Sequence, residues 1–322
     1  MKILVTGDNG FIGKQIVSHL RRLGHDVYGC GRRPSKLNHR KALYIDGNEE
    51  LIQESERFPV VHDIRYVLDL KNRSSVVKML SDCGPDVIIH CAANATPQTG
   101  IDGAYSMYND NVMSTFTLAK EASQKCKFIF LSSIVVYGDV KPNIPTEWID
   151  VCHSISPTSM YGLSKSNAEK VLQFLRDESF TKIIRMGAIV GPGLTHGIIK
   201  DFIKKLKTDS EYLEVLGDKP GSSKPFLHVS DLLRVINLLL EDRTNKQNIH
   251  NICNKDQASV EEIANSVMEV MNIHKPIKWL GSEANWKGDN KILRAKVSNL
   301  GVGWEPSLDS IGAIRLSVKE NL

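Results

Sequence analysis

The sequence predicts an α/β protein built on a doubly wound parallel sheet, and two observations support this fold class. Through the first 190 residues, short apolar runs such as "KILVT" and "KFIFLSS" alternate with amphipathic stretches. Such alternation is typical of parallel strands covered by helices on both faces. The second observation is a glycine-rich segment, "TGDNGFIG", placed between the first apolar run and the first amphipathic stretch.

The expected elements follow in order along the chain. The strands are six apolar runs, "KILVT", "DVYGC", "RYVLDL", "DVIIHCAA", "KFIFLSS" and "KIIRMGAIV". Helices are expected at 11–23, 73–82, 105–125, 161–177 and 198–208. The polar stretch 34–62 interrupts this rhythm, and one short strand and one short helix are expected in it. The later runs "FLHV" and "NIHNI" are expected to return to the main sheet, so that a smaller lobe is built from two separate segments.

Composition excludes several classes of protein. The 322 residues carry a net charge of +4, and the basic residues are scattered apart from "KKLK", which suits a solvated helix face better than a nucleic-acid patch. The six cysteines show neither C-x-x-C pairing nor zinc-ligand spacing, so we expect no metal site and a reduced, intracellular protein. No window reaches the roughly 18 apolar residues of a membrane span. We therefore expect a cytoplasmic protein without nucleic-acid or membrane partners.

The glycine segment predicts a dinucleotide site. Gly7, Gly10 and Gly13 lie between a strand and a helix. Such a loop provides a tight turn and a close approach of the backbone to a pyrophosphate, and the N-terminal N–H groups of the helix point at the phosphates.

The residues after the second strand bear on the choice of cofactor. An NAD-selective site offers an acid to the ribose hydroxyls there, whereas this chain reads "GCGRRP". Arg32 and Arg33 offer guanidinium groups suited to a 2′-phosphate, which favours NADP. NAD with two exposed arginines on the loop is the alternative.

Several motifs together resemble the extended short-chain dehydrogenases/reductases that act on nucleotide sugars. Beside the G-x-x-G-x-x-G loop, these are "VIIHCAANA", "YNDNVMSTFTLAKEA", "FIFLSSIVVYG", "SMYGLSK", "RMGAIVGPG", "FLHVSDL" and "NLGVGWEP", in the order of the family. The resemblance implies a Rossmann-type domain at 1–186 and 228–253, and a substrate-binding lobe at 187–227 and 254–322. It also implies a homodimer formed through the helices at about 105–125 and 161–177, although the apolar faces of these helices equally suit the core.

The resemblance also assigns site residues. Asp69 is expected at the adenine amino group with Leu70 beside the ring, and the small residues after the fourth strand are expected along the cofactor. The cofactor residues that it implies are Gly7, Gly10, Phe11, Ile12, Gly13, Arg32, Arg33, Asp69, Leu70, Cys91, Ala92, Ala93, Asn111, Ser132, Tyr161 and Lys165.

The chemistry expected of Ser133, Tyr161 and Lys165 follows from their side chains. A phenol has a pKa near 10, so it needs a positive charge nearby to act as a base at neutral pH. Lys165 lies one helical turn after Tyr161 and on the same face. We expect Tyr161 to transfer the proton, Lys165 to lower its pKa and hold the nicotinamide ribose, and Ser133 to orient the substrate.

Departures from the family pattern limit the assignment of a substrate. Ser133 is followed by the apolar Ile134 and Val135, which cannot supply the acidic pair of a dehydratase, and Val135 also replaces the cysteine of reductases that epimerise C3 and C5. Ala188 stands where an asparagine usually touches the diphosphate. The candidates for the nucleotide-sugar pocket are Ser133, His196, Lys224 and Asp289, with Lys287 as a further possibility.

The resulting functional prediction is an oxidoreductase acting at C4 of a nucleoside-diphosphate sugar. The arginines favour an NADPH-dependent 4-keto sugar reductase, because a dissociable NADPH suits net reduction. A nucleotide-sugar 4-epimerase is the alternative. From other classes, a non-catalytic NAD(P)-binding regulatory protein and a dehydrogenase of hydrophobic alcohols share parts of the pattern.

Overall fold

The computed structural model describes residues 1–33, 41–46, 49–53, 64–95, 100–141, 143–241, 247–281, 291–300 and 303–322. Within these residues a single large sheet organises the chain. Its strands are β1 (Lys2–Thr6), β2 (Asp26–Gly31), β3 (Lys41–Asp46), β4 (Glu49–Gln53), β5 (Ile64–Val67), β6 (Val87–His90), β7 (Lys127–Ser133), β8 (Thr181–Met186) and β13 (Ile249–Ile252).

The strand order in this sheet is β13-β8-β7-β6-β1-β2-β5-β3-β4. The pairs β1–β2, β1–β6, β2–β5, β6–β7 and β3–β5 are parallel. The order runs outward from β1 in both directions, as in a doubly wound sheet. The predicted fold class is therefore confirmed.

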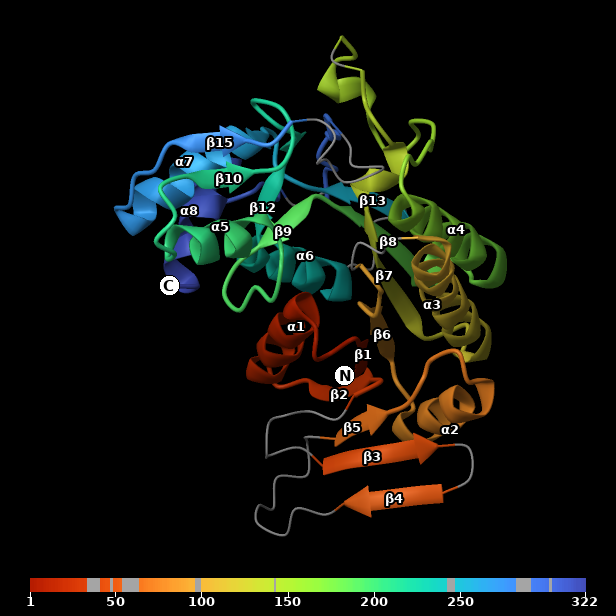
Figure 1. Cartoon of the computed structure of the whole chain (residues 1–322). Helices are drawn as coiled ribbons and strands as arrows, with labels where there is room; N and C mark the ends of the chain where they lie inside the picture. The colour runs from red at the N-terminus through yellow and green to blue at the C-terminus, as the bar shows by residue number, and fades with distance from the viewer. Residues whose placement is uncertain are drawn as a thin grey trace. The chain divides into compact units, whose positions relative to one another are not determined.

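The helices that follow these strands are α1 (Phe11–Arg22), α2 (Arg73–Cys83), α3 (Gly100–Glu121) and α4 (Met160–Leu175). Figure 1 shows α1 on one face of the sheet and α2, α3 and α4 on the other. The helix α1 buries Ile16, Val17 and Leu20, whose spacing forms one apolar face. Ile3 and Leu4 of β1 are completely buried, as expected for a strand covered on both faces.

The prediction for 34–62 was wrong in part. Its described residues hold two strands, because β3 and β4 pair antiparallel as a hairpin at the edge of the sheet. No helix occurs in the parts of this stretch that the structure describes, 41–46 and 49–53. Polar alternation in a hairpin resembles a surface loop at the level of sequence.

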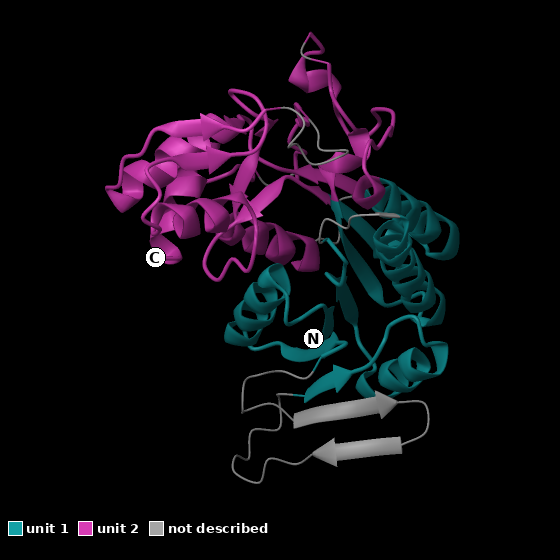
Figure 2. Ribbon diagram, in the orientation of Figure 1, with its two compact units in different colours: residues 1–132, 163–184, 246–248 teal, residues 133–162, 185–245, 249–322 magenta. Residues whose placement is uncertain are grey.

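Contacts between residues divide the chain into two compact units (Figure 2). Unit 1 comprises 1–132, 163–184 and 246–248, and unit 2 comprises 133–162, 185–245 and 249–322. The boundary falls inside the main sheet, because β13 and the end of β8 belong to unit 2. These units therefore do not test the predicted boundaries of the dinucleotide domain and the substrate lobe, which stay a prediction.

Unit 2 contains further elements around two-stranded sheets. They are η1 (Ile134–Tyr137), η2 (Thr146–Trp148), β9 (Ala188–Val190), α5 (Ile198–Leu206), β10 (Leu213–Val215), β11 (Ser223–Lys224), β12 (Phe226–His228), α6 (Val229–Glu241), β14 (Ala258–Ser259), α7 (Val260–Met271), β15 (Ile277–Trp279) and α8 (Ser310–Glu320). A short helix in unit 1, η3 (Glu178–Phe180), completes the described elements.

The expected return of "FLHV" to the main sheet was wrong. This run forms β12, which pairs in parallel with β9, whereas "NIHNI" does join the main sheet as β13. The run "KIIRMGAIV" divides at Gly187, whose N–H donates to the Ile252 carbonyl while the next N–H donates to Pro225. A Cβ at Gly187 would lie 2.9 Å from both the Cys253 Cβ and the Pro225 carbonyl oxygen, so only glycine fits where the chain leaves one sheet for the other.

Candidate functional site

The glycine loop connects β1 to α1 in unit 1, as the sequence predicts. Gly7 has φ of +68°, and a Cβ there would lie 2.8 Å from the backbone of Ala92. A Cβ on Gly13 would lie 2.2 Å from the carbonyl oxygen of Gly7. The helix α1 starts after Gly10 and no side chain caps its first turn. Loop, strand end and helix thus form the close backbone cradle that a pyrophosphate requires.

A buried ion pair lies directly behind this loop. Arg65 of β5 and Asp8 of the loop are 1% and 0% exposed, and Nε lies 2.8 Å from Oδ2. Glycines on β2 leave room for the pair, because a Cβ at Gly29 would lie 2.3 Å from Asp8 Oδ2 and one at Gly31 would lie 2.7 Å from an Arg65 Nη. Sequence reasoning missed this pair. Its signal was the alternate glycines in "DVYGCG", which remove side chains from one face of a strand.

Unit 1 contains a pocket of about 230 Å³ above the glycine loop. It brings together many of the predicted cofactor residues, namely Gly7, Gly10, Arg32, Asp69, Leu70, Cys91, Ala92 and Ala93. Five further lining residues were not predicted: Gly31, Leu68, Asn94, Asp110 and Ser114. The other predicted cofactor residues lie outside this lining: Phe11, Ile12, Gly13, Arg33, Asn111, Ser132, Tyr161 and Lys165. The small lining residues and the bare helix N-terminus fit a dinucleotide.

Charges of both signs meet at the pocket. Arg32 Nη1 lies 3.0 Å from the Asp110 carboxylate, and Lys71 Nζ lies 2.6 Å from its other oxygen. Lys71 also lies 3.6 Å from Asp69. Burial opposes ionisation of Asp110, but the hydrogen bond from Lys71 and the charge of Arg32 outweigh it, and the pKa of Asp110 is lowered. The Asp110 hydrogen bond correspondingly raises the pKa of Lys71. Two cations therefore neutralise the acid that faces the pocket.

A chain of hydrogen bonds supports the end of β6 beneath the pocket. The Thr6 hydroxyl accepts from the Ala92 N–H at 3.2 Å and lies 2.7 Å from His90 Nδ1. His90 Nε2 lies 3.0 Å from Thr115 Oγ1, which donates to the Asn111 carbonyl. These partners fit a neutral imidazole with its proton on Nε2, which donates to Thr115 while Nδ1 accepts from Thr6. Burial, together with the charge of Lys165, lowers the pKa of His90 to about 3.

Asn111 has a supporting position. It is 3% exposed, its Oδ1 accepts from the Asn94 N–H at 2.6 Å, and its Nδ2 donates to the Asn94 carbonyl and to Ser164 Oγ. Its side chain therefore orders the segment that lines the pocket.

Lys165 and Tyr161 occupy successive turns of α4. Lys165 is 2% exposed, its Nζ donates to the Leu131 carbonyl at 2.7 Å, and Nζ lies 4.6 Å from the centroid of the Phe130 ring. Burial lowers the pKa of Lys165 to about 8, while Cys91 and Glu169 act in the opposite direction. The amine is still mostly protonated at neutral pH.

Burial dominates the pKa of Tyr161 in this structure, and the expected lowering of that pKa by Lys165 stays a prediction. Burial raises the pKa of Tyr161 to about 12. Loss of hydration disfavours the charged phenolate. The phenol therefore holds its proton at neutral pH.

The two serines at the end of β7 have different surroundings. The Ser132 hydroxyl is completely buried and donates to Glu169 Oε1 at 2.5 Å. Ser133 is partly exposed, its Oγ lies 3.4 Å from the Met186 carbonyl, and it accepts from the Val135 N–H at the start of η1. Of the two hydroxyls, the structure thus leaves that of Ser133 the more accessible.

The predicted substrate residues lie in unit 2, apart from Asp289 and Lys287, which fall outside the described residues. His196 is exposed, and its Nδ1 lies 2.9 Å from Thr195 Oγ1. Lys224 is half-buried in β11, opposite Ala258 of β14. His196 precedes α5 and Lys224 lies on β11, and the substrate roles expected of both stay predictions.

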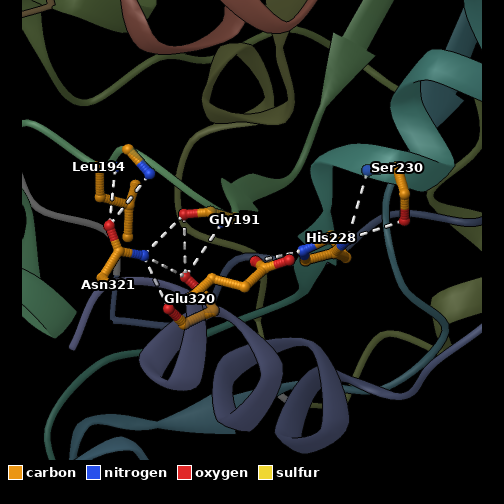
Figure 3. Close-up of polar contacts among 8 residues, drawn as sticks. Gly191, Leu194, His228, Ser230, Glu320 and Asn321 are labelled. Atoms are coloured by element: carbon orange, nitrogen blue, oxygen red, sulfur yellow. Dashed lines mark hydrogen bonds and ion pairs between the residues drawn. The ribbon is translucent and has the colours of Figure 1, made fainter.

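The segment that precedes His196 is tied to the C-terminal residues (Figure 3). Asn321 Oδ1 accepts from the N–H groups of Gly193 and Leu194, and its Nδ2 donates to the Gly191 carbonyl at 2.8 Å. Beside it, His228 Nε2 lies 3.0 Å from Glu320 Oε2. Sequence reasoning missed these contacts, because no short-range pattern links positions about 130 residues apart.

Two features are absent from the part of the chain that the structure describes. None of the helices in these residues has the length and apolarity to cross a membrane. Among the same residues, no three histidine, cysteine, aspartate or glutamate side chains cluster in a way that would hold a metal ion.

Comparison with known proteins places this geometry in a family. The family model described as "NAD dependent epimerase/dehydratase family" matches residues 3–253. The UDP-glucose 4-epimerase of Lactobacillus helveticus is 24% identical over 97% of this chain and 94% of its own length. A dTDP-4-dehydro-6-deoxy-D-allose reductase of a Streptomyces species is 27% identical over 84% of this chain and 81% of its own.

A solved structure shares the fold over nearly the whole chain. The structure of the Thermus thermophilus UDP-glucose 4-epimerase, determined in complex with NAD, is 21% identical in sequence and superposes with a TM-score of 0.80. The match covers 99% of this chain and 98% of that one. The family match, which covers most of the chain, agrees with the glycine cradle, the pocket and the strand order. The chain therefore belongs to the NAD dependent epimerase/dehydratase family.

Proposed function

We propose that this protein is an NADPH-dependent reductase of 4-keto nucleoside-diphosphate sugars, with Ser133, Tyr161 and Lys165 as its catalytic residues. The observation that carries the proposal is the position of Arg32. It lines the pocket directly after β2, where Gly31 ends the strand and no acid is present. An acid at that position would bind ribose hydroxyls, whereas a guanidinium binds a 2′-phosphate.

The charge balance at the pocket supports this choice. Asp110 would repel a phosphate if it were alone, but Arg32 and Lys71 both pair with it. Arg33, the next residue in the chain, is exposed and lies outside the pocket lining. NADPH would be held by the glycine cradle, Arg32 and Asp69, and when bound it supplies the hydride.

The chain's own residues supply the proton and the orientation. The Tyr161 phenol, protonated at neutral pH, donates to the oxygen at C4 as that oxygen gains negative charge. The Lys165 ammonium one turn away stabilises the resulting phenolate. The Ser133 hydroxyl, partly exposed at the end of β7, orients the same oxygen.

A nucleotide-sugar 4-epimerase is the second candidate. It is favoured by the Lactobacillus helveticus relative, which this chain matches over 94% of its length, and by the Thermus thermophilus fold in complex with NAD. An epimerase would use Tyr161 first as a base and then as an acid, and would recycle its cofactor.

One experiment separates the two candidates. The purified protein is incubated with a panel of nucleotide sugars and 4-keto nucleotide sugars, with NADPH or NAD. We expect stoichiometric NADPH oxidation with a 4-keto sugar. Interconversion of C4 epimers without net change in cofactor would instead establish the epimerase. Isothermal titration should show NADPH binding at least about tenfold tighter than NADH, which corresponds to one good charge-assisted contact.

A further inference from the structure

The helix α4 carries a buried carboxylate that the proposed reaction does not use. Glu169 is 1% exposed, and its Oε1 accepts a 2.5 Å hydrogen bond from the Ser132 hydroxyl. Glutamates are almost never fully buried unless they are paired, because removing a carboxylate from water is costly. The position of Glu169 therefore calls for a partner that gains from its charge.

The spacing along α4 identifies that partner. Tyr161, Lys165 and Glu169 follow one another at intervals of four residues, so their side chains share one face of the helix. Two neighbouring residues of β7 meet this face, since Lys165 Nζ donates to the Leu131 carbonyl and the Ser132 hydroxyl donates to Glu169. Both polar side chains are thus held against the end of one strand.

The charges around Lys165 show what the carboxylate does. Burial destabilises the ammonium, and both Glu169 and Cys91 oppose that effect. Burial also raises the pKa of the Cys91 thiol to about 12, so this thiol is neutral at physiological pH. His90, whose pKa falls to about 3, is neutral as well. Among these neighbours, Glu169 is the carboxyl group, and it acts to raise the pKa of Lys165.

We propose that Glu169 is a positioning residue for the proton transfer: with the Ser132 hydroxyl as its anchor on β7, its carboxylate keeps Lys165 in the ammonium form beside Tyr161. This inference rests on the proposed catalytic role of Lys165 and Tyr161. It also gives Ser132 a role through Glu169 in place of direct contact with the cofactor.

The test is an NMR titration that needs no substrate. Protein labelled with ¹³C at the lysine Cε is titrated from pH 6 to 11 (about the range in which lysines lose their proton), and Lys165→Met assigns the Lys165 signal by its disappearance. Glu169→Gln removes the charge while keeping an acceptor for Ser132. Glu178→Gln, at an exposed position in η3, removes the same charge as a matched control.

The expected result is that the Lys165 midpoint falls by at least about one pH unit in Glu169→Gln and does not move in Glu178→Gln. An unchanged midpoint in a folded Glu169→Gln protein overturns the proposal. If Glu169→Gln does not fold, Ser132→Ala decides, because it keeps the carboxylate but removes its anchor. The Lys165 midpoint should then fall by less than a full loss of the carboxylate would cause, and an unchanged midpoint would overturn the anchored arrangement.

The kinetic consequence is measured separately. With an accepted substrate, the alkaline limb of kcat should move to lower pH in Glu169→Gln by the same amount as the Lys165 midpoint. Because the titration is independent of the substrate, a wrong assignment of the reaction leaves the NMR result interpretable. A shifted midpoint without a shifted alkaline limb would confine the role of Glu169 to the charge of Lys165 and overturn its role in proton transfer.

Discussion

The pocket of unit 1 and the substrate region of unit 2 differ in the kind of residue on which they depend. The pocket is formed by backbone atoms, glycines and small side chains, with Gly7, Ala92 and Ala93 among its lining. The substrate candidates are long polar side chains on separate elements, such as His196 before α5 and Lys224 on β11. Backbone cradles tolerate little variation, whereas a polar side chain is replaced at little cost in stability.

This difference explains why the cofactor pocket could be predicted from the sequence more completely than the substrate region. A glycine loop leaves a pattern within the seven residues from Gly7 to Gly13, because a side chain at each of these glycines would meet nearby backbone atoms. A sugar pocket leaves isolated residues at long intervals, and here Ala188 and Lys224 depart from the family pattern. The following predictions separate cofactor binding from substrate binding, from the largest expected effect to the smallest.

Replacing Tyr161 should separate chemistry from cofactor binding. Tyr161→Phe removes the proton donor, and we expect kcat to fall by at least about 10³-fold, within the range for loss of a general acid. The Kd for NADPH, measured by titration calorimetry, should change less than twofold, because the pocket lining does not include Tyr161. Full activity would refute the catalytic assignment, and loss of NADPH binding would show that the two regions are not separable.

The glycine cradle should respond to a single methyl group. In Gly7→Ala the new Cβ meets the Ala92 backbone at 2.8 Å, and the residue must keep a φ of +68°. We expect at least about tenfold weaker NADPH binding and a loss of about 2 kcal/mol in the free energy of unfolding.

The matched control for Gly7→Ala is Gly24→Ala. Gly24 has φ of +80°, but no atom lies within 4 Å of its added Cβ. It should lose only the backbone contribution to stability, about 1 kcal/mol, and retain NADPH affinity. Equal losses of affinity in the two variants would contradict the steric account of the cradle.

Arg32 and Lys224 should divide the two binding functions between them. In Arg32→Ala, loss of the guanidinium should weaken NADPH binding by about 10- to 100-fold and leave NADH almost unaffected, since Lys71 still neutralises Asp110. Lys224→Ala should raise the KM for the nucleotide sugar without changing the Kd for NADPH. If Arg32→Ala weakens both cofactors equally, the preference for NADP is wrong.

The neutral His90 should make unit 1 sensitive to acid. Its pKa of about 3 in the folded protein lies below the unfolded value of 6.5, so the unfolded chain binds more protons between these values. Stability is therefore retained above pH 6.5 and falls by up to about 1.4 kcal/mol per pH unit below it. Urea unfolding at pH 7 and pH 5 should show a smaller acid loss in His90→Gln, whereas the exposed His274→Gln should behave as the wild type does.

Much of the fold could be predicted because local sequence determines it. The apolar runs, the helix starts and the glycine loop each satisfy a demand within a few residues, and α1, α2 and α5 begin at the predicted positions. The hairpin β3–β4 and the pairing of β12 with β9 were missed. Pairing partners depend on which strand edges are available in space, and a short apolar run does not record its neighbour.

The site shows the same division. The pocket lining contains Asp69, Cys91 and Ala93 as predicted. No local sequence motif marked Asp110 or the ion pair of Asp8 with Arg65, so neither was predicted. The placement of Tyr161 and Lys165 on one helical face was expected from their spacing, but the burial that raises the pKa of Tyr161 was not. Spacing reports which side chains are near, and it does not report how much water surrounds them.

The sequence by itself determined the fold class, the family resemblance, the glycine cradle and the pairing of Tyr161 with Lys165 on one helical face. These features depend on periodicity and on steric demands that act between close neighbours in the chain. Only the tertiary structure decided the ion pair of Arg32 with Asp110, the neutral state of His90 and the burial of Glu169 beside Ser132. Charge and hydration depend on contacts between distant segments, because the dielectric surroundings of a side chain are created when those segments pack together.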